Sequence, residues 1–396
     1  MLNLYRLIDK KVYLTRMKYL LNIPSITKLE KKYVSDVLKK GWLSAEGEHT
    51  KIFEKKLSKL LTAKYGFAVQ SGTAALHTAL KTLGVKSGDR VIVPNYTCLS
   101  NLSAVTQCGA IPIIVEVERE TMGLDYNLLK KSIKLYKPKV VQLVHVYGFF
   151  AKDTLKIVKL CKKNNIKLLE DNSEALGSSY KGKMTGKFGD ISIASLRSEK
   201  MIGVGEGGFI STDNFKLYDQ AYLYASRNAK FRTSKDPYWK KYLVQGEGYN
   251  YRLPHLLGAL GRAQIERFRK DLLAKKITVG KNYRKIFKDE RYDFIQKITK
   301  GSRPVYWLNG IYIKNSDIKK TIKVGNALMK EGVEVRSAFW PLNEQEGFKF
   351  KYVGNKKVCK DVFAKSIILP SAYNMSIKDI KNIKKILDKI LDELRI

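Results

Sequence analysis

The sequence predicts an α/β fold with a mostly parallel, seven-stranded sheet between helices, followed by a smaller C-terminal α+β domain. Short β-rich runs alternate with helical segments from about residue 66 onward, which is the rhythm of βαβ units. Runs such as Val91-Ile92-Val93 are continuously apolar, which indicates strands buried on both faces. The seven predicted strands are residues 66–70, 90–94, 111–117, 140–147, 167–171, 191–196 and 208–212.

Helical spacing of apolar residues fills the gaps between strands, for example over residues 74–83 and 151–164. After about residue 262 the pattern changes to a long basic helix at 264–287, mixed segments and a final helix at 377–394. We therefore expect three parts, which are an N-terminal extension over residues 1–22, a large domain over 23–262 and a small domain over 263–396. Ligands of parallel sheets bind beyond the carboxyl ends of the strands.

The composition limits the class of protein. The chain has 396 residues, 44% of them hydrophobic, so it is neither a disordered tail nor a disulfide miniprotein. It carries 75 Lys and Arg against 37 Asp and Glu, a formal charge of +38. Such an excess attracts nucleic acid, a membrane surface or a phosphorylated small molecule. The lysines are scattered over helical segments, which favours solvated lysines, so we expect no nucleic-acid partner.

The cysteine and hydropathy patterns predict where in the cell the protein is found. The four cysteines have no CxxC spacing and are typical of reduced thiols in the cytoplasm, where we expect the protein. No stretch approaches the roughly 20 apolar residues that span a bilayer, so we expect no integral membrane association. The basic segment 1–21 lacks the features of a signal peptide. Packing on its own protein is favoured for it over contact with a membrane or a partner subunit.

A first candidate site lies where the strand at 66–70 ends and a helix begins. Ser71, Gly72 and Thr73 are small residues at that junction. Free backbone N–H groups and the helix dipole form an anion site there, and the Thr73 hydroxyl suits a phosphate. Taken alone, the motif is also an ordinary helix cap, which is the favoured interpretation.

A second candidate is Asp171, which follows the apolar run 166–169. An acid at the carboxyl end of a buried parallel strand points into the crevice, where a cation or a protonated ring nitrogen is needed to balance its charge. Capping of the next turn explains this motif equally well when it stands alone.

A third candidate is Lys200, which precedes a glycine-rich turn. Gly203, Gly205 and Gly208 match GxGxxG formally, but they lead into a strand instead of opening a helix, so a dinucleotide site is excluded. A lysine beside a sheet edge suits an amine poised for Schiff-base chemistry. Because the chain holds 75 basic residues, chance placement of one lysine near glycines stays an alternative.

The order of these motifs favours one cofactor. A phosphate turn, an acid at a strand end and the pair Ser195 and Lys200 before a glycine-rich turn are what a pyridoxal phosphate (PLP) enzyme requires. That cofactor needs a phosphate cup, a carboxylate for its ring nitrogen and a lysine that binds it covalently.

On these motifs the sequence resembles the DegT/DnrJ/EryC1/StrS family of sugar aminotransferases, which are fold-type I PLP-dependent transferases, from about residue 23 to the C-terminus. Glu174 and the pair Glu120-Thr121 are similar to perosamine synthase-like members. The further matching stretches are Gly41-Trp42-Leu43-Ser44, Ser71-Gly72-Thr73-Ala74-Ala75-Leu76, Gly88-Asp89-Arg90-Val91-Ile92-Val93-Pro94, His145-Val146-Tyr147-Gly148, Glu170-Asp171, Gly189-Asp190, Gly205-Glu206-Gly207-Gly208, Tyr249-Asn250-Tyr251-Arg252 and Trp340-Pro341-Leu342.

The resemblance implies a role for each site residue. Lys200 would be the catalytic residue that carries the cofactor, Asp171 would pair with the pyridinium nitrogen, and Glu174 would lie against the ring near its hydroxyl. The residues that would hold the phosphate are Gly72, Thr73, Ser195 and, from the neighbouring subunit of a homodimer, Asn250.

The resemblance also implies the reaction, in which L-glutamate donates an amino group to a nucleotide-linked 4-keto-6-deoxy sugar such as GDP-4-keto-6-deoxymannose. A UDP- or dTDP-linked keto sugar is an alternative acceptor. A non-catalytic protein that binds PLP, or a regulatory one, is an alternative function. Sugar 3-dehydratases similar to this family carry histidine in place of the lysine, so Lys200 favours aminotransfer over dehydration.

The sequence departs from the family pattern at two positions. Cys98 stands where relatives place an aromatic residue over the cofactor ring, and Asn343 stands where they carry histidine. Either the cofactor ring is sandwiched between other side chains or the small Cys98 side chain admits a bulkier substrate.

His145 is expected to be a structural histidine at a strand end. The remaining histidines are too dispersed for a metal site, and no metal is expected.

Overall fold

The computed structural model describes residues 17–229, 243–244 and 246–396. Most of the basic segment 1–21 therefore lies outside the described residues. Among the described residues, no helix is long and apolar enough to span a membrane. All four cysteines are free thiols. The cytoplasmic location expected from the cysteine pattern stays a prediction.

The large sheet contains all seven predicted strands and one more, although the strands predicted at 111–117, 140–147 and 191–196 end at residues 115, 144 and 195. In chain order the seven are β1 (Tyr65–Val69), β2 (Arg90–Pro94), β3 (Ile111–Val115), β4 (Val140–Val144), β5 (Lys167–Asp171), β8 (Ile191–Ser195) and β9 (Gly208–Thr212). The spatial order is β1-β9-β8-β5-β4-β2-β3-β14, and β9 pairs antiparallel with both of its neighbours while the other pairs are parallel. The prediction of a mostly parallel sheet is confirmed.

The eighth strand, β14 (Lys351–Val353), comes from the C-terminal part of the chain and pairs in parallel with β3. It is only three residues long and carries no continuous apolar run, so the sequence did not predict it.

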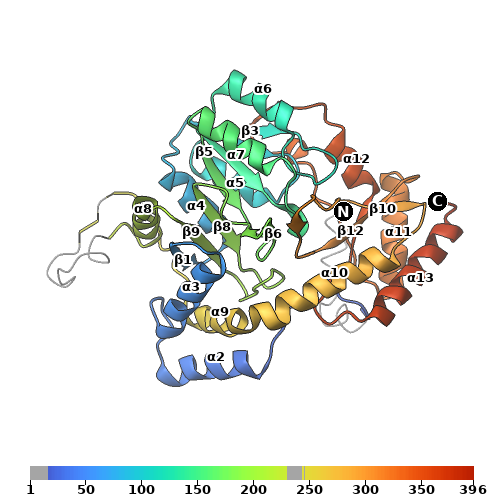
Figure 1. The fold of residues 1–396 in the computed structure, drawn as a ribbon, viewed down its shortest axis with the longest axis horizontal. Helices are drawn as coiled ribbons and strands as arrows, with labels where there is room; N and C mark the ends of the chain where they lie inside the picture. The colour runs from blue at the N-terminus through green and yellow to red at the C-terminus, as the bar shows by residue number, and fades with distance from the viewer. Residues whose placement is uncertain (1–16, 230–242, 245) are drawn as a thin grey trace.

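Helices cover both faces of the large sheet (Figure 1). On one face lie α4 (Gly72–Thr82), α5 (Leu99–Gln107) and α8 (Phe215–Ala225), and on the other lie α6 (Tyr126–Tyr136) and α7 (Thr154–Lys163). Val91 and Val93 belong to the first hydrophobic cluster, whereas Ile92 between them belongs to the second. This alternation explains why β2 reads as a continuous apolar run.

The predicted basic helix begins earlier than expected. Helix α9 (His255–Arg267) continues through a π-helical turn (Phe268–Leu273) into α10 (Ala274–Ile286). Figure 1 shows these segments as one long helix running from the N-terminal helices α2 (Lys28–Lys40) and α3 (Glu48–Leu60) toward the C-terminal helix α13 (Ile377–Glu393). The predicted domain boundaries at 22/23 and 262/263 stay a prediction, and the helix is continuous across residue 262.

The C-terminal part contains a four-stranded antiparallel sheet, β10-β12-β15-β13 (Tyr292–Phe294, Asn309–Ile313, Ser366–Leu369 and Arg336–Ser337). Its apolar core includes residues of α11 (Ile318–Lys330) and α13. Helix α12 (Val358–Lys365) lies beside it. A three-stranded sheet is formed by β11 (Ser302–Arg303), β6 (Ser179–Tyr180) and β7 (Lys183–Met184).

Candidate active site

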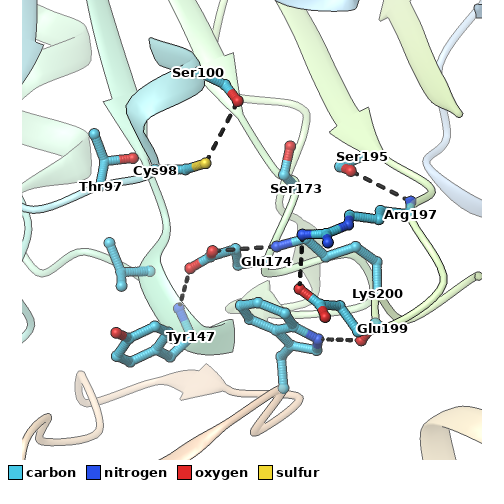
Figure 2. Close-up of polar contacts among 12 residues, drawn as sticks. Thr97, Cys98, Ser100, Tyr147, Ser173, Glu174, Ser195, Arg197, Glu199 and Lys200 are labelled. Carbon is cyan, nitrogen blue, oxygen red and sulfur yellow. Dashed lines mark hydrogen bonds and ion pairs between the residues drawn. The ribbon is translucent and has the colours of Figure 1, made fainter. Parts of the chain in front are cut away.

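Lys200 and Glu174 form a buried pair beside the carboxyl ends of β5 and β8. Lys200 lies in the turn between β8 and β9, and its Nζ donates to Glu174 Oε1 at 3.2 Å (Figure 2). The side chains are 11% and 6% exposed. The centre of the Trp307 indole ring lies 3.5 Å from the Lys200 Nζ. The amine is therefore fixed by a carboxylate and an aromatic face.

The protonation of Glu174 reflects opposing effects. Burial raises the pKa of this carboxyl, and the neighbouring charge of Asp171 raises it further, whereas Lys200 and the Tyr147 N–H lower it. The balance is a raised pKa. Glu174 therefore keeps its proton to a higher pH than an exposed glutamate does.

Tyr147 reaches Glu174 through an unusual backbone turn directly after β4. Its N–H donates to Glu174 Oε2 at 2.9 Å, and its φ is +53°. Gly148 follows with φ +95°, and a Cβ there would lie 2.8 Å from the Trp307 backbone nitrogen. Only glycine fits this approach, which brings the Trp307 segment close to the Lys200 pair.

Asp171 ends β5 with its carboxylate buried among neutral donors. Asn101 Nδ2 donates to Oδ2, and the Ser173 N–H donates to Oδ1, both at 2.9 Å. Asn101 is held in turn by Gln142, whose Oε1 accepts at 2.7 Å, and by Thr97, whose hydroxyl donates at 2.9 Å. This network orients the carboxylate while leaving its charge available for a cationic partner.

The turn predicted to hold a phosphate lies between β1 and α4 and forms a helix cap. Ser71 caps α4 by accepting from the Ala74 N–H at 3.0 Å. The Thr73 hydroxyl donates to Ser100 Oγ at 3.2 Å. A Cβ on Gly72 would lie 3.0 Å from Ser195 Cβ and 3.2 Å from its Oγ, so glycine keeps open the space between the helix N-terminus and β8.

Asn250 lies on the segment between α8 and α9, next to Tyr251, whose carbonyl accepts from the Gln70 N–H at 2.7 Å. It is exposed, forms a backbone bridge to Ser226, and its Oδ1 accepts from Arg252 Nε at 3.1 Å.

The two departures from the family pattern have distinct surroundings. Cys98 is exposed at the start of α5, with its sulfur 3.4 Å from Ser100 Oγ. Tyr96 is buried, and its hydroxyl donates to the Tyr147 hydroxyl at 3.3 Å. Asn343 is engaged with Asn95, whose Nδ2 donates to Asn343 Oδ1 at 2.7 Å and whose Oδ1 accepts from the Asn343 N–H at 2.9 Å.

His145 has the structural surroundings that were expected. Its Nδ1 accepts from the Ala151 N–H at 3.2 Å, so its Nε2 carries the proton and donates to Glu170 Oε1 at 3.1 Å. Glu170 also accepts from the backbone of Gly186 and Phe188, both at 2.6 Å. Across the described part of the chain, no group of acidic, histidine and cysteine side chains could hold a metal ion.

Comparison with known proteins identifies the family. The model of the DegT/DnrJ/EryC1/StrS aminotransferase family matches residues 24–388. The chain belongs to this family. The GDP-perosamine synthase of Escherichia coli O157:H7 is 33% identical over 364 residues, which cover 91% of this chain and 95% of that protein. The GDP-perosamine synthase of Vibrio cholerae is 32% identical, with 80% of this chain and 84% of that protein covered.

Solved structures show the same fold. The aminotransferase PseC of Helicobacter pylori, involved in the biosynthesis of pseudoaminic acid, has a TM-score of 0.87 at 24% identity over 95% of this chain and 99% of that one. The putative sugar aminotransferase Spr1654 of Streptococcus pneumoniae has a TM-score of 0.86 at 23% identity over the same shares of the two chains. The fold-type I prediction is confirmed.

Members of the DegT/DnrJ/EryC1/StrS family are PLP-dependent sugar aminotransferases, so the predicted enzyme class and cofactor are confirmed. The described residues fit this cofactor. The open turn at Gly72 and Ser195 suits a phosphate, the Asp171 carboxylate suits a protonated ring nitrogen, and the Lys200 amine suits a carbonyl carbon. The individual roles of these residues stay predictions.

Sequence reasoning missed three parts of this site. Asn101 and Gln142, which hold Asp171, had one detectable signal, a glutamine inside the apolar run 140–144. Tyr147 lay within a matched motif without an assigned role. No sequence pattern marks Trp307 as a site residue, because its contact with Lys200 arises only from tertiary packing.

Proposed function

We propose that the protein transfers the amino group of L-glutamate to C4 of a nucleotide-linked 4-keto-6-deoxy sugar, with GDP-4-keto-6-deoxymannose as the leading acceptor. The observation that carries the proposal is the buried pair of Lys200 and Glu174 beside Asp171, in a chain similar to GDP-perosamine synthases of three bacteria. The excess of positive charge favours an acceptor that carries a diphosphate.

Each residue has a task in this proposal. Bound PLP supplies an electron sink that stabilises negative charge at the reacting carbon. Asp171 balances the positive charge of the ring nitrogen, which strengthens that effect. Lys200 would take the proton from the donor α-carbon and deliver it to the C4′ carbon of the cofactor, and it would run the same transfer in reverse with the sugar. Glu174 keeps the Lys200 amine in position by accepting its hydrogen bond.

The first half-reaction is tested by the visible spectrum of the PLP-loaded protein. Addition of L-glutamate alone is expected to remove the band of the lysine-bound cofactor and to release 2-oxoglutarate, with pyridoxamine phosphate appearing. D-glutamate serves as the matched control. A spectrum unchanged by L-glutamate and by the other common L-amino acids would favour the non-catalytic PLP-binding alternative.

The acceptor is tested in the second half-reaction. The pyridoxamine-phosphate form is mixed with GDP-, UDP- or dTDP-linked 4-keto-6-deoxy sugars, and return of the lysine-bound band is followed. The GDP-linked sugar is expected to restore the band at the lowest concentration. Restoration of the band at a lower concentration of a UDP- or dTDP-linked sugar would overturn the choice of nucleotide while leaving aminotransfer intact.

The proposal includes a homodimer in which Asn250 completes the site of the neighbouring subunit. Its support is the family resemblance, together with the exposure of Asn250 and of the large apolar residues Trp42 and Leu43, which are 57% and 50% exposed.

A complementation experiment tests this arrangement. Lys200→Ala and Asn250→Ala chains are each expected to have little activity, whereas dissociation and reassociation of an equal mixture restores about a quarter of the wild-type rate. Half of the dimers are then mixed, and one of their two sites is intact. Absence of recovery, with mixed dimers demonstrated by two affinity tags, would contradict a shared site.

A further inference from the structure

Lys276 is a fully buried lysine on α10 whose partners are all neutral oxygens. Its Nζ donates to Asn22 Oδ1 at 3.1 Å, to the Trp307 carbonyl at 3.0 Å and to the Ser371 carbonyl. Three acceptors match the three N–H bonds of an ammonium group. Burial without a carboxylate opposes that charge and lowers the pKa of Lys276 to about 7.

Packing alone does not account for this residue. Methionine would fill a similar volume without the free-energy cost of burying an amine, and replacement of buried charged groups by apolar ones is often stabilising. A lysine at this place therefore needs another explanation. The residues that accept its hydrogen bonds, and the groups that those residues contact, provide one.

Two of the acceptor residues hold the backbone directly before Lys200. The Trp307 indole N–H donates to the Glu199 carbonyl at 2.6 Å, and Asn22 Nδ2 donates to the same oxygen. The centre of the Trp307 ring also lies 3.5 Å from the Lys200 Nζ. Displacement of either residue would thus move the catalytic turn.

The third acceptor, Ser371, is close in sequence to a residue that holds the backbone directly after Lys200. Ser371 is two residues from Tyr373, whose ring centre lies 4.9 Å from the Lys276 Nζ. The Tyr373 hydroxyl donates to the Met201 carbonyl at 3.0 Å. The carbonyls on both sides of Lys200 are therefore held by residues that Lys276 contacts.

We propose that Lys276 is a positioning residue for Lys200, which fixes the segments around Asn22, Trp307 and Tyr373 so that the catalytic turn presents its amine to Glu174 and to the cofactor. The proposal rests on the assignment of Lys200 as the catalytic amine. It assigns no contact between Lys276 and the substrate.

The test compares Lys276→Met with Lys275→Met. Lys275 is the adjacent lysine on the same helix, is 56% exposed and pairs with Asp271, so its replacement controls for loss of one charge. The first measurement uses cofactor-free protein. The acetylation rate of Lys200 by acetic anhydride is measured by mass spectrometry relative to exposed lysines in the same sample. We expect this rate to rise about tenfold in Lys276→Met, because an amine released from Glu174 and Trp307 is more accessible, and to stay the same in the control.

The second measurement is the half-reaction of the PLP-loaded enzyme with L-glutamate. We expect its maximal rate to fall about tenfold or more in Lys276→Met, with little change in the glutamate concentration for half-saturation, because the amine is misplaced and the donor site is not. Acetylation and half-reaction rates within twofold of Lys275→Met would overturn the proposal.

A second variant covers failure of Lys276→Met to fold. Tyr373→Phe removes the phenol hydroxyl that holds the Met201 carbonyl, while Lys276, its acceptors and the Trp307 ring beside Lys200 remain. The same change in Lys200 acetylation is expected, and an unchanged rate would overturn the proposal. Full turnover by Lys200→Ala would instead refute the assignment of the catalytic amine, so the two failures are distinguishable.

Discussion

Replacement of Lys200 by alanine is expected to abolish the absorbance band of the lysine-bound cofactor and to lower aminotransfer by at least about 10³-fold. The amine whose Nζ is fixed by Glu174 and Trp307 would be lost, and with it both covalent attachment and proton transfer. The fold should remain, since the side chain lies in a turn and belongs to no hydrophobic cluster.

The measurement combines the visible spectrum, turnover with L-glutamate, and far-ultraviolet circular dichroism. Lys216→Ala, which removes an exposed lysine from α8, is the matched control and should retain both the band and the activity. A Lys200→Ala enzyme that turns over at the wild-type rate would show that the site has been assigned to the wrong lysine.

Replacement of Asp171 by asparagine is expected to have a different signature. The amide has nearly the same shape but no charge, so the ring nitrogen of the cofactor would lose its counter-ion, and turnover should fall about 10²- to 10³-fold. Its NH₂ group would also face the Asn101 amide, which donates to the present carboxylate at 2.9 Å. Because Lys200 is intact, the lysine-bound band should persist.

Cofactor titration and single-turnover kinetics with L-glutamate check this expectation. Asp219→Asn, the same chemical change on α8, is the control. Equal rates for Asp171→Asn and Asp219→Asn would remove Asp171 from the catalytic machinery, whereas loss of the band together with the rate would indicate that it acts mainly in cofactor binding.

Seven strands of the large sheet were predictable because local sequence encodes them. Val91-Ile92-Val93 is apolar at every position since both faces of β2 are covered, and Asp171 and Ser195 follow such runs at the sheet edge where ligands bind. The roles of individual residues came from the family motifs and not from periodicity.

The start of α9 was missed for a physical reason. Gly258 and Gly261 resemble helix breakers in the sequence, yet they lie where α9 approaches α3, and a Cβ on Gly258 would be 2.1 Å from the Thr50 hydroxyl. These two glycines allow α9 to pack closely on α3, and they do not end the helix. The surroundings of Lys276 were equally hidden, because Asn22, Trp307 and Ser371 are far from it in sequence and meet only in the folded chain.

The pairing of β14 with β3 affects how the chain folds during its synthesis. The large sheet is built almost entirely from residues before 213, but its last strand is Lys351–Val353. During synthesis from the N-terminus, one edge of β3 therefore remains uncovered until most of the C-terminal part has left the ribosome. A truncated chain ending before residue 351 would keep this edge open, which makes incomplete chains of this enzyme a template for strand addition between molecules.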